Sequence, residues 1–180
     1  LANPDPESRV KTTNYVLESC FVAQVMGAER IVIHSGALMK RSRQEALDIA
    51  KETLKQVLEA CDRQGYGNIT LCPETMGKIN QLGDLEEVLA ICAPSEGLLP
   101  CVDFGHLYAR SLGALDGAAV EGMLDRMVQG LGEARARVFH SHFSKIQFTP
   151  NGGEKMHLTF AQDDFGPDPA PLMAEVARRG

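Results

Sequence analysis

The stretch CVDFGHLYAR, residues 101–110, begins with a short apolar run and then places Asp103 and His106 three residues apart. An apolar run of this kind is typical of a buried strand. Carboxylate and imidazole groups are common ligands of divalent metal ions. The pair lies just where the predicted strand ends. This position suggests a metal site at the end of a strand, and the fold must explain why it lies there.

Strand-like and helix-like segments alternate along the whole chain. Ser42 with Glu45 forms a capping-box signal before an apolar helical face that Gly65 ends, and Asp84 with Glu87 marks the start of another helix. Because a predicted helix separates each pair of predicted strands, the pattern predicts a parallel sheet covered by helices. The predicted strands are residues 31–36, 68–74, 98–104 and 136–142, and the predicted helices are residues 13–30, 42–64, 84–91, 118–128 and 171–179.

The sequence favours a closed barrel over an open nucleotide-binding sheet, because it contains neither of the usual glycine-rich phosphate-binding motifs. In a β/α barrel the carboxyl ends of the strands meet on one face, where the chemistry takes place. We therefore predict an α/β protein with a parallel β/α (TIM) barrel, in which residues 1–180 belong to a single domain. One polar side chain stands at the carboxyl end of each predicted strand: His34, Glu74, Asp103 and His140.

The composition is that of an ordinary globular domain, 44% hydrophobic and 23% charged. The net charge is −6, so a nucleic-acid partner would require a local basic patch. No apolar run approaches the roughly 20 residues of a membrane helix, and residues 1–9 lack the pattern of a signal peptide. We therefore expect a cytoplasmic protein without membrane contact. The five cysteines are unclustered among apolar neighbours, and we interpret them as reduced core thiols.

All five histidines fall at or just after a predicted strand end, or in the predicted loop that follows the last strand. Histidines that serve only packing or solubility would scatter, so this pattern favours a shared metal site. Glu74, Asp103 and Glu154 would supply its anionic charge. Simpler readings stay open, because His34 or His142 alone could be a hydrogen-bonded core histidine and Glu74 could cap a turn.

Four segments resemble the successive metal-ligand motifs of the endonuclease IV family of apurinic/apyrimidinic endonucleases, a family of β/α barrels in the xylose isomerase-like superfamily. Those motifs are His-Pro-Gly, Glu-Asn-Thr, Asp-Thr-x-His and His-x-Asn-Asp-x-Lys, and their order matches over most of the chain. The segments here are IVIHSGALM, LCPETMGKINQLG, CVDFGHLYA and FHSHFSKIQ. The resemblance implies a set of metal ligands, and a lysine in the place of the motif's lysine: His34, Glu74, Asp103, His106 and His140, with Lys145.

The family's next segment, Asp-x-His, corresponds here to GGEKMHLTF, residues 152–160. Glu154 can replace the aspartate, but Met156 occupies the histidine position and His157 comes one residue later. A third metal site therefore depends on whether Glu154 or His157 can join His106. The family's first histidine and its final glutamate fall outside the sequence, so we expect a xylose isomerase-like barrel that is incomplete at both ends.

The resemblance implies a hydrolase that cleaves duplex DNA at abasic sites and that is a monomer when intact. It also implies two or three Zn²⁺ ions, with Mn²⁺ or Fe²⁺ as alternatives. Glu74 would act as the catalytic residue by bridging two ions and orienting the attacking water. Lys145 stands in the place of the motif's lysine and would bind DNA. Lys40 and Arg41 follow His34 in the sequence, on the predicted active face, where they could contact DNA phosphates; the alternative is that they belong to the solvated start of a helix.

Two other functions stay open. In a sugar isomerase or epimerase of the same superfamily, one divalent ion held by Glu74, Asp103 and His140 would chelate adjacent oxygens of a small sugar substrate. A metal-binding protein without catalysis would need only the ligands. His34 and the acidic segment at Glu154 favour the endonuclease, because they can hold further ions.

Overall fold

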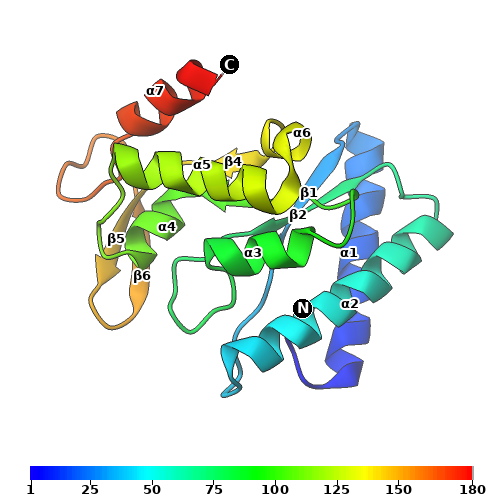
Figure 1. Ribbon diagram of the computed structural model, residues 1–180. Helices are drawn as coiled ribbons and strands as arrows, with labels where there is room; N and C mark the ends of the chain where they lie inside the picture. The colour runs from blue at the N-terminus through cyan, green and yellow to red at the C-terminus, as the bar shows by residue number, and fades with distance from the viewer. Residues whose placement is uncertain (180) are drawn as a thin grey trace.

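The computed structural model, which describes residues 1–179, contains a four-stranded parallel sheet and a separate two-stranded hairpin. The strands of the sheet pair in chain order, and neighbouring helices contact one another in the order α1, α2, α3, α5 and α7 (Figure 1). A parallel sheet flanked by successive helices is the arrangement predicted from the alternating segments. The strands are β1 (Arg30–His34), β2 (Thr70–Glu74), β3 (Cys101–Asp103) and β4 (His140–His142).

The helices follow the predicted segments, with two additions, α4 and α6. In the part of the chain that the structure describes, β1 and β4 are the outer strands of the sheet, and each has one edge without a partner strand. The helices are α1 (Pro6–Met26), α2 (Arg43–Arg63), α3 (Leu85–Cys92), α4 (Phe104–Arg110), α5 (Gly117–Leu131), α6 (Glu133–Ala136) and α7 (Ala170–Arg179).

Helix α1 begins earlier than the apolar pattern from Thr13 predicts. The side chain of Asp5 accepts hydrogen bonds from the backbone N–H groups of Glu7 and Ser8, which would otherwise lack partners in the first turn. Pro6 occupies the first helical position, where its missing N–H costs nothing. These two signals start the helix upstream of the apolar face.

The predicted capping box at the start of α2 is present, and a second capping box, at the predicted start of α3, also ties the two helices together. In α3 the carboxylate of Glu87 accepts from the backbone of Asp84, and it also lies 2.6 Å from Nε of Arg43 at the start of α2. Arg43 in turn donates to the backbone oxygens of Ile79 and Gln81. This network fixes the loop after β2 at the end of the sheet where the strands terminate.

Residues 101–110 form a strand and a helix with no loop between them. Asp103 ends β3 and also caps α4, because its Oδ1 accepts a hydrogen bond of 2.8 Å from the backbone N–H of His106. A Cβ atom on Gly105 would lie 2.5 Å from the backbone oxygen of Ser144, so a glycine is required where α4 approaches the end of β4. His106 therefore lies just after a strand end, as predicted, but in a helix that the sequence did not predict.

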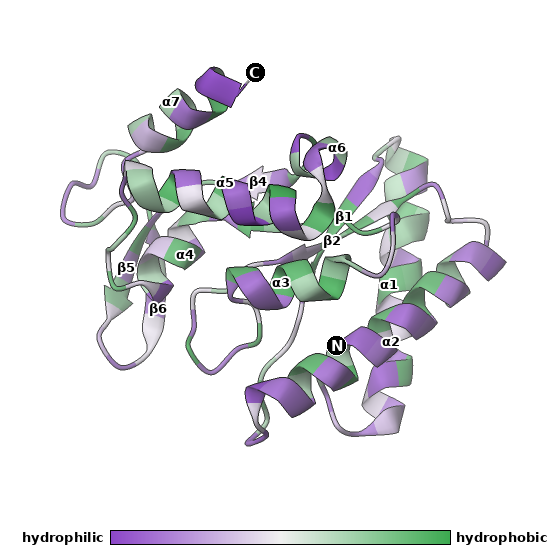
Figure 2. Cartoon of the chain, in the orientation of Figure 1, coloured by the Kyte–Doolittle hydropathy of each residue, from purple (hydrophilic) through white to green (hydrophobic). Residues whose placement is uncertain are grey.

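The core lies between the sheet and its helices. Helices α2, α3 and α5 carry both hydrophobic and hydrophilic residues, as expected for helices with one buried face (Figure 2). Among the fully buried side chains are Leu54, Leu71, Val88 and Phe104. All five cysteines are buried and free, as expected from their apolar neighbours in the sequence. Within residues 1–179 there is no helix with the length and apolar character needed to span a bilayer.

The segment after β4 forms an antiparallel hairpin of β5 (Lys145–Thr149) and β6 (Gly153–Leu158). Both strands contact α4, so the hairpin lies over the end of the sheet where α4 begins. From the sequence, the residues around His157 are expected to form a loop after the last strand. That interpretation is wrong, because His157 pairs with Ile146 inside the hairpin.

Candidate metal centre

The last residue of each strand in the sheet is a histidine or a carboxylate. His34 and Glu74 are partners in the register of β1 with β2, and Asp103 and His142 are partners in the register of β3 with β4. Because the strands are parallel, their carboxyl ends lie on the same side of the sheet. Glu74 partners Cys101 in the register of β2 with β3, so Asp103 and His142 lie two residues further along, and the four side chains form a staggered row at that end.

Glu74 lies at the centre of this row and is only 4% exposed. Its Oε2 lies 3.0 Å from Nε2 of His34, and its Oε1 lies 2.6 Å from Nδ1 of His142. Burial alone would raise the pKa of Glu74, but the hydrogen bonds from the two imidazoles outweigh burial and leave that pKa below its ordinary value. The hydrogen bond to Glu74 raises the pKa of His34. Glu74 is therefore an anion that favours a cation beside it.

Asp103 connects the row to helix α4. While its Oδ1 caps the helix, its Oδ2 lies 3.6 Å from Nδ1 of His106 and 3.9 Å from Nδ1 of His142. The backbone N–H of Asp103 donates to Oγ1 of Thr75 at 2.8 Å, which holds the end of β3 against the end of β2. The carboxylate is therefore fixed in position by its own strand and by the helix that follows.

The hydrogen bonds of His106 determine which ring nitrogen is available as a ligand. Nδ1 lies 2.8 Å from the backbone oxygen of Thr75. A carbonyl oxygen only accepts, so Nδ1 carries the proton and Nε2 of the neutral ring keeps a free lone pair. Nε2 lies 3.5 Å from Oε2 of Glu154. A backbone partner that orients one nitrogen and leaves the other free is typical of metal-binding histidines.

The hairpin contains an irregularity in β6. Phe148 pairs with Glu154, but the preceding residue, Gln147, pairs with Met156, so Lys155 has no partner in the ladder. This is a β-bulge, in which two residues of one strand face a single residue of the other. Beyond an extra residue, the alternation of side chains between the two faces is reversed.

The bulge places Glu154 and His157 on the same face of the hairpin although they are three residues apart. Nε2 of His157 lies 3.7 Å from Oε1 of Glu154, and the rings of His157 and His106 are 5.4 Å apart. Met156 is 49% exposed. The histidine one residue beyond its expected position thus reaches the site, and the methionine at the expected position lies on the other face.

Two groups of possible ligands share this end of the sheet. One consists of Glu74, Asp103 and His142, and in each group the ligand atoms lie within 4.8 Å of one another. A tetrahedral zinc ion with bonds of about 2.0–2.2 Å holds its ligands roughly 3.3–3.6 Å apart, so small side-chain rotations would close either group around an ion. Mixed carboxylate and imidazole donors suit Zn²⁺, Mn²⁺ or Fe²⁺. The second group consists of His106, Glu154 and His157.

Of the two histidines of β4, His142 contacts Glu74, whereas the resemblance names His140 as the ligand. His140 lies two residues earlier on β4, partners Cys101 in the register of the sheet, and has its ring 5.1 Å from that of His142. The alternation His-x-His indicates that both rings share a face, but it does not tell which ring lies level with Asp103. The register of β4 against β3 decides this, and the local sequence does not contain it.

The basic residues predicted to contact DNA lie in two different environments. Lys40 and Arg41 are exposed in the loop between β1 and α2, at the end of the sheet where the strands terminate. Nζ of Lys145 instead donates to the backbone oxygen of Gln162 at 2.7 Å and lies 3.1 Å from Oδ1 of Asp163. Lys145 thereby anchors the segment that follows the hairpin.

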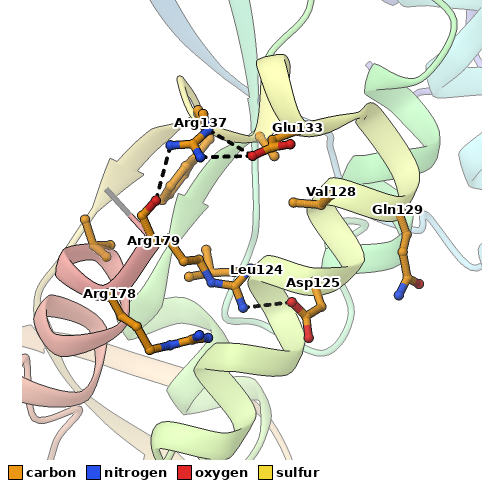
Figure 3. Close-up of a pocket in the computed structure, with 11 residues that line it drawn as sticks. Leu124, Asp125, Val128, Gln129, Glu133, Arg137, Arg178 and Arg179 are labelled. Atoms are coloured by element: carbon orange, nitrogen blue, oxygen red, sulfur yellow. Dashed lines mark hydrogen bonds and ion pairs between the residues drawn. The ribbon is translucent and has the colours of Figure 1, made fainter.

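A groove of about 510 Å³ lies elsewhere, between α5, α6 and α7. Two ion pairs between its lining residues are visible in Figure 3: Arg179 lies 2.7 Å from Asp125, and Arg137 lies 2.9 Å from Glu133. None of the candidate ligands is among the described residues that line it. The groove marks where α7 packs on α5 and has no part in the metal centre.

Comparison with known proteins agrees with this architecture. The sequence pattern of the family described as "Xylose isomerase-like TIM barrel" matches residues 1–180. An uncharacterized protein of Methanocaldococcus jannaschii is 32% identical over 87% of this chain and 54% of its own length. A protein of Acholeplasma laidlawii named "Probable endonuclease 4" is 33% identical over 51% of this chain and 31% of its own length.

Solved structures share the fold at low sequence identity. A D-tagatose 3-epimerase-like protein superposes with a TM-score of 0.74 at 19% identity, covering 99% of this chain and 62% of the other. The 3-keto-D-glucoside 4-epimerase of E. coli gives a TM-score of 0.58 at 13% identity, covering 79% of this chain and 54% of the other. The predicted xylose isomerase-like barrel is confirmed. The chain spans about half the length of the M. jannaschii relative, 54%.

Proposed function

The chain belongs to the xylose isomerase-like TIM barrel family, and on that premise we propose that the intact protein is a metal-dependent hydrolase that cleaves phosphodiesters at abasic sites in duplex DNA. Relatives named "Probable endonuclease 4" in three organisms support the choice within the family. Their identities of 33%, 23% and 24% are low, so the proposal depends mainly on the arrangement of the site.

The observation that carries the proposal is the second ligand group beside the first. A sugar isomerase needs one ion to chelate adjacent oxygens, and Glu74, Asp103 and His142 are enough for that. His106, Glu154 and His157 form a further group, and Asp103 lies between the two, 3.6 Å from His106. Several ions close together suit displacement at a phosphodiester, where the attacking and the leaving oxygens both carry charge.

The residues themselves have separable tasks in this reaction. Bound Zn²⁺, Mn²⁺ or Fe²⁺ would supply Lewis acidity and a lowered pKa for water. Glu74 stays ionised at neutral pH and can orient a water molecule by accepting its hydrogen bond. Lys40 and Arg41, exposed at the same end of the sheet, can hold the phosphates on either side of the abasic nucleotide. Lys145 positions the hairpin through its contact with Asp163.

A sugar isomerase or epimerase is the second candidate. It is favoured by the compactness of the group of Glu74, Asp103 and His142, which by itself provides two carboxylates and an imidazole for one ion. In that case the second group would serve proton transfer, with neutral His106 or His157 accepting a proton from the sugar.

One experiment on the full-length protein, loaded with Zn²⁺ or Mn²⁺, distinguishes the endonuclease from the sugar isomerase or epimerase. A labelled duplex with a single abasic-site analogue is incubated with the wild type and with Glu74→Gln, and the same preparations are incubated with a panel of ketoses and aldoses. We expect cleavage at the abasic site by the wild type, a loss of at least about 100-fold in Glu74→Gln, and no conversion of sugars. Cleavage should weaken steeply with added salt, as phosphate contacts are screened.

Undamaged duplex of the same sequence is the matched control for the substrate. Conversion of a sugar without cleavage of abasic DNA would establish the second candidate instead. Equal cleavage by wild type and Glu74→Gln would show that the activity comes from a contaminant or from another site.

A further inference from the structure

A third set of donor atoms lies directly beneath Asp103 and at the level of Glu74. In the register of β3 with β4, Cys101 and His140 are partners, one layer below the pair Asp103 and His142. The sulfur of Cys101 and one nitrogen from each of His140 and His142 lie within 4.8 Å of one another. Cys101 is completely buried, and its sulfur is 3.9 Å from Oε1 of Glu74.

This environment sets Cys101 apart from the other described cysteines. All five are buried, but of those that the structure describes only Cys101 belongs to a group of three possible metal ligands. Cys72 provides a close comparison, because it packs in the same small apolar cluster as Cys101 and Leu99 and is also completely buried. Packing alone does not explain why the buried thiol of Cys101 lies beside the imidazoles of His140 and His142.

We propose that Cys101, His140 and His142 form a metal site for a thiophilic ion such as Zn²⁺, which differs from the two carboxylate groups by its sulfur ligand and shares His142 with one of them. One thiolate and two imidazoles give three protein ligands and leave a fourth position open, which is a common arrangement for zinc. When the sulfur–metal bond forms, the thiol releases its proton to solvent, so that one ion replaces one proton at Cys101. Sulfur also distinguishes this site from the carboxylate groups, because thiolate favours Zn²⁺ and Co²⁺ over Mn²⁺.

The site is coupled to the carboxylate row through His142. The same ring has Nδ1 2.6 Å from Oε1 of Glu74 and also completes the group with Cys101. An ion bound at Cys101 would reorient this ring or share it, and would therefore alter the affinity of the row for its own ion. The inference does not depend on which substrate the protein acts on.

Cobalt provides the test, because a cobalt–thiolate bond gives a charge-transfer absorption in the near ultraviolet that oxygen and nitrogen ligands do not give. The full-length protein and the variants Cys101→Ser, His140→Asn and Cys72→Ser are titrated with Co²⁺, and the same proteins are titrated with Mn²⁺ by electron paramagnetic resonance. We expect the band in the wild type and Cys72→Ser, its loss in Cys101→Ser, and a fall of at least about tenfold in Co²⁺ affinity at that band in His140→Asn. Mn²⁺ binding should be unchanged in Cys101→Ser and His140→Asn.

The wild-type spectrum alone can overturn the proposal, so the test does not depend on how well Cys101→Ser folds. Bound Co²⁺ that shows only the visible bands of oxygen and nitrogen ligation would refute the thiolate site while leaving the carboxylate groups intact. A charge-transfer band of equal strength in Cys101→Ser would also refute it. Failure of the proposed DNA cleavage would leave these spectra unaffected, so the two proposals fail separately.

Discussion

Nδ1 of His142 lies 2.6 Å from Oε1 of Glu74, whereas His140, two residues earlier on the same strand, lies level with Cys101. Glu74 is buried and has a second imidazole, that of His34, at 3.0 Å from its other oxygen. Glu74 therefore has a histidine at each of its two oxygens, and this arrangement predicts which of the two neighbouring histidines on β4 supports the carboxylate row.

We expect His142→Ala to weaken Mn²⁺ binding by at least about tenfold and His140→Ala to leave it unchanged. Mn²⁺ prefers carboxylate and imidazole ligands, so it reports on the row around Glu74 and not on Cys101. Isothermal titration calorimetry with Mn²⁺ measures the affinity of each variant, starting from metal-free protein. A larger loss in His140→Ala than in His142→Ala would show that the sequence motif, and not the register of β4, identifies the ligand.

Substitutions of Asp103 should separate its two roles. Asp103→Ala removes both the ligand and the cap of α4, so we expect loss of metal and a decrease of about 1 kcal/mol in the free energy of unfolding of the metal-free protein. Asparagine is also a good helix cap, so Asp103→Asn should keep the metal-free stability and still lose most of the metal affinity. Chemical denaturation with and without metal measures both quantities. Equal stability of the two metal-free variants would show that the cap contributes little.

The pKa values of His34 and Glu74 predict how the metal-free protein responds to pH. The hydrogen bond to Glu74 raises the pKa of His34 above 6.5, so its contribution to stability is complete below pH 6.5 and is lost as pH rises through the raised value. The pKa of Glu74 is below 4.5, so its contribution is present above pH 4.5 and is lost as pH falls through the lowered value. The pair therefore stabilises the fold most between about pH 4.5 and 6.5.

Titration by NMR of the metal-free protein checks these directions. His34 should titrate above 6.5 and return toward 6.5 in Glu74→Gln. His140 is an internal control, because burial lowers its pKa and it should titrate below 6.5. A pKa of His34 that does not respond to Glu74→Gln would exclude the hydrogen bond as the cause.

The sequence predicted the parallel sheet and the polar residues at the strand ends because both depend on local signals. Each of these signals involves residues that are close together in the chain: the capping boxes, the β-branched runs and the polar residues that end each run. From them, His34, Glu74 and Asp103 were correctly predicted to lie at the ends of their strands. Strand β3 is only three residues long and passes directly into a helix, so α4 gave no separate signal. The position of His142 depends on pairing between strands, which a single segment does not determine.

The hairpin was not predicted, because the local sequence pattern of its second strand is irregular. Its second strand does not alternate regularly, because the bulge at Lys155 interrupts the period of two by which strands are recognised. The same irregularity made His157 look misplaced beside the Asp-x-His motif. The apparent departure in the sequence and the missed strand therefore have a single structural cause.

That cause leads to a prediction that reverses the expectation from the motif. Exchanging the two residues in the double variant Met156→His, His157→Met restores the motif's spacing from Glu154, yet it turns the imidazole to the face away from His106. We expect this variant to lose the metal at the second group, while the row around Glu74 keeps its own.

Deletion of Lys155 is the complementary change. It removes the bulge together with the extra residue, so Glu154 and His157 become two residues apart and stay on one face, and we expect the second group to keep its metal. The number of bound Zn²⁺ ions is measured in the wild type, the double variant and the deletion variant. Lys155→Ala is the control, because it keeps both the chain length and the bulge. Full zinc content in the double variant, or its loss in the deletion variant at unchanged thermal stability, would show that the bulge does not place His157 in the site.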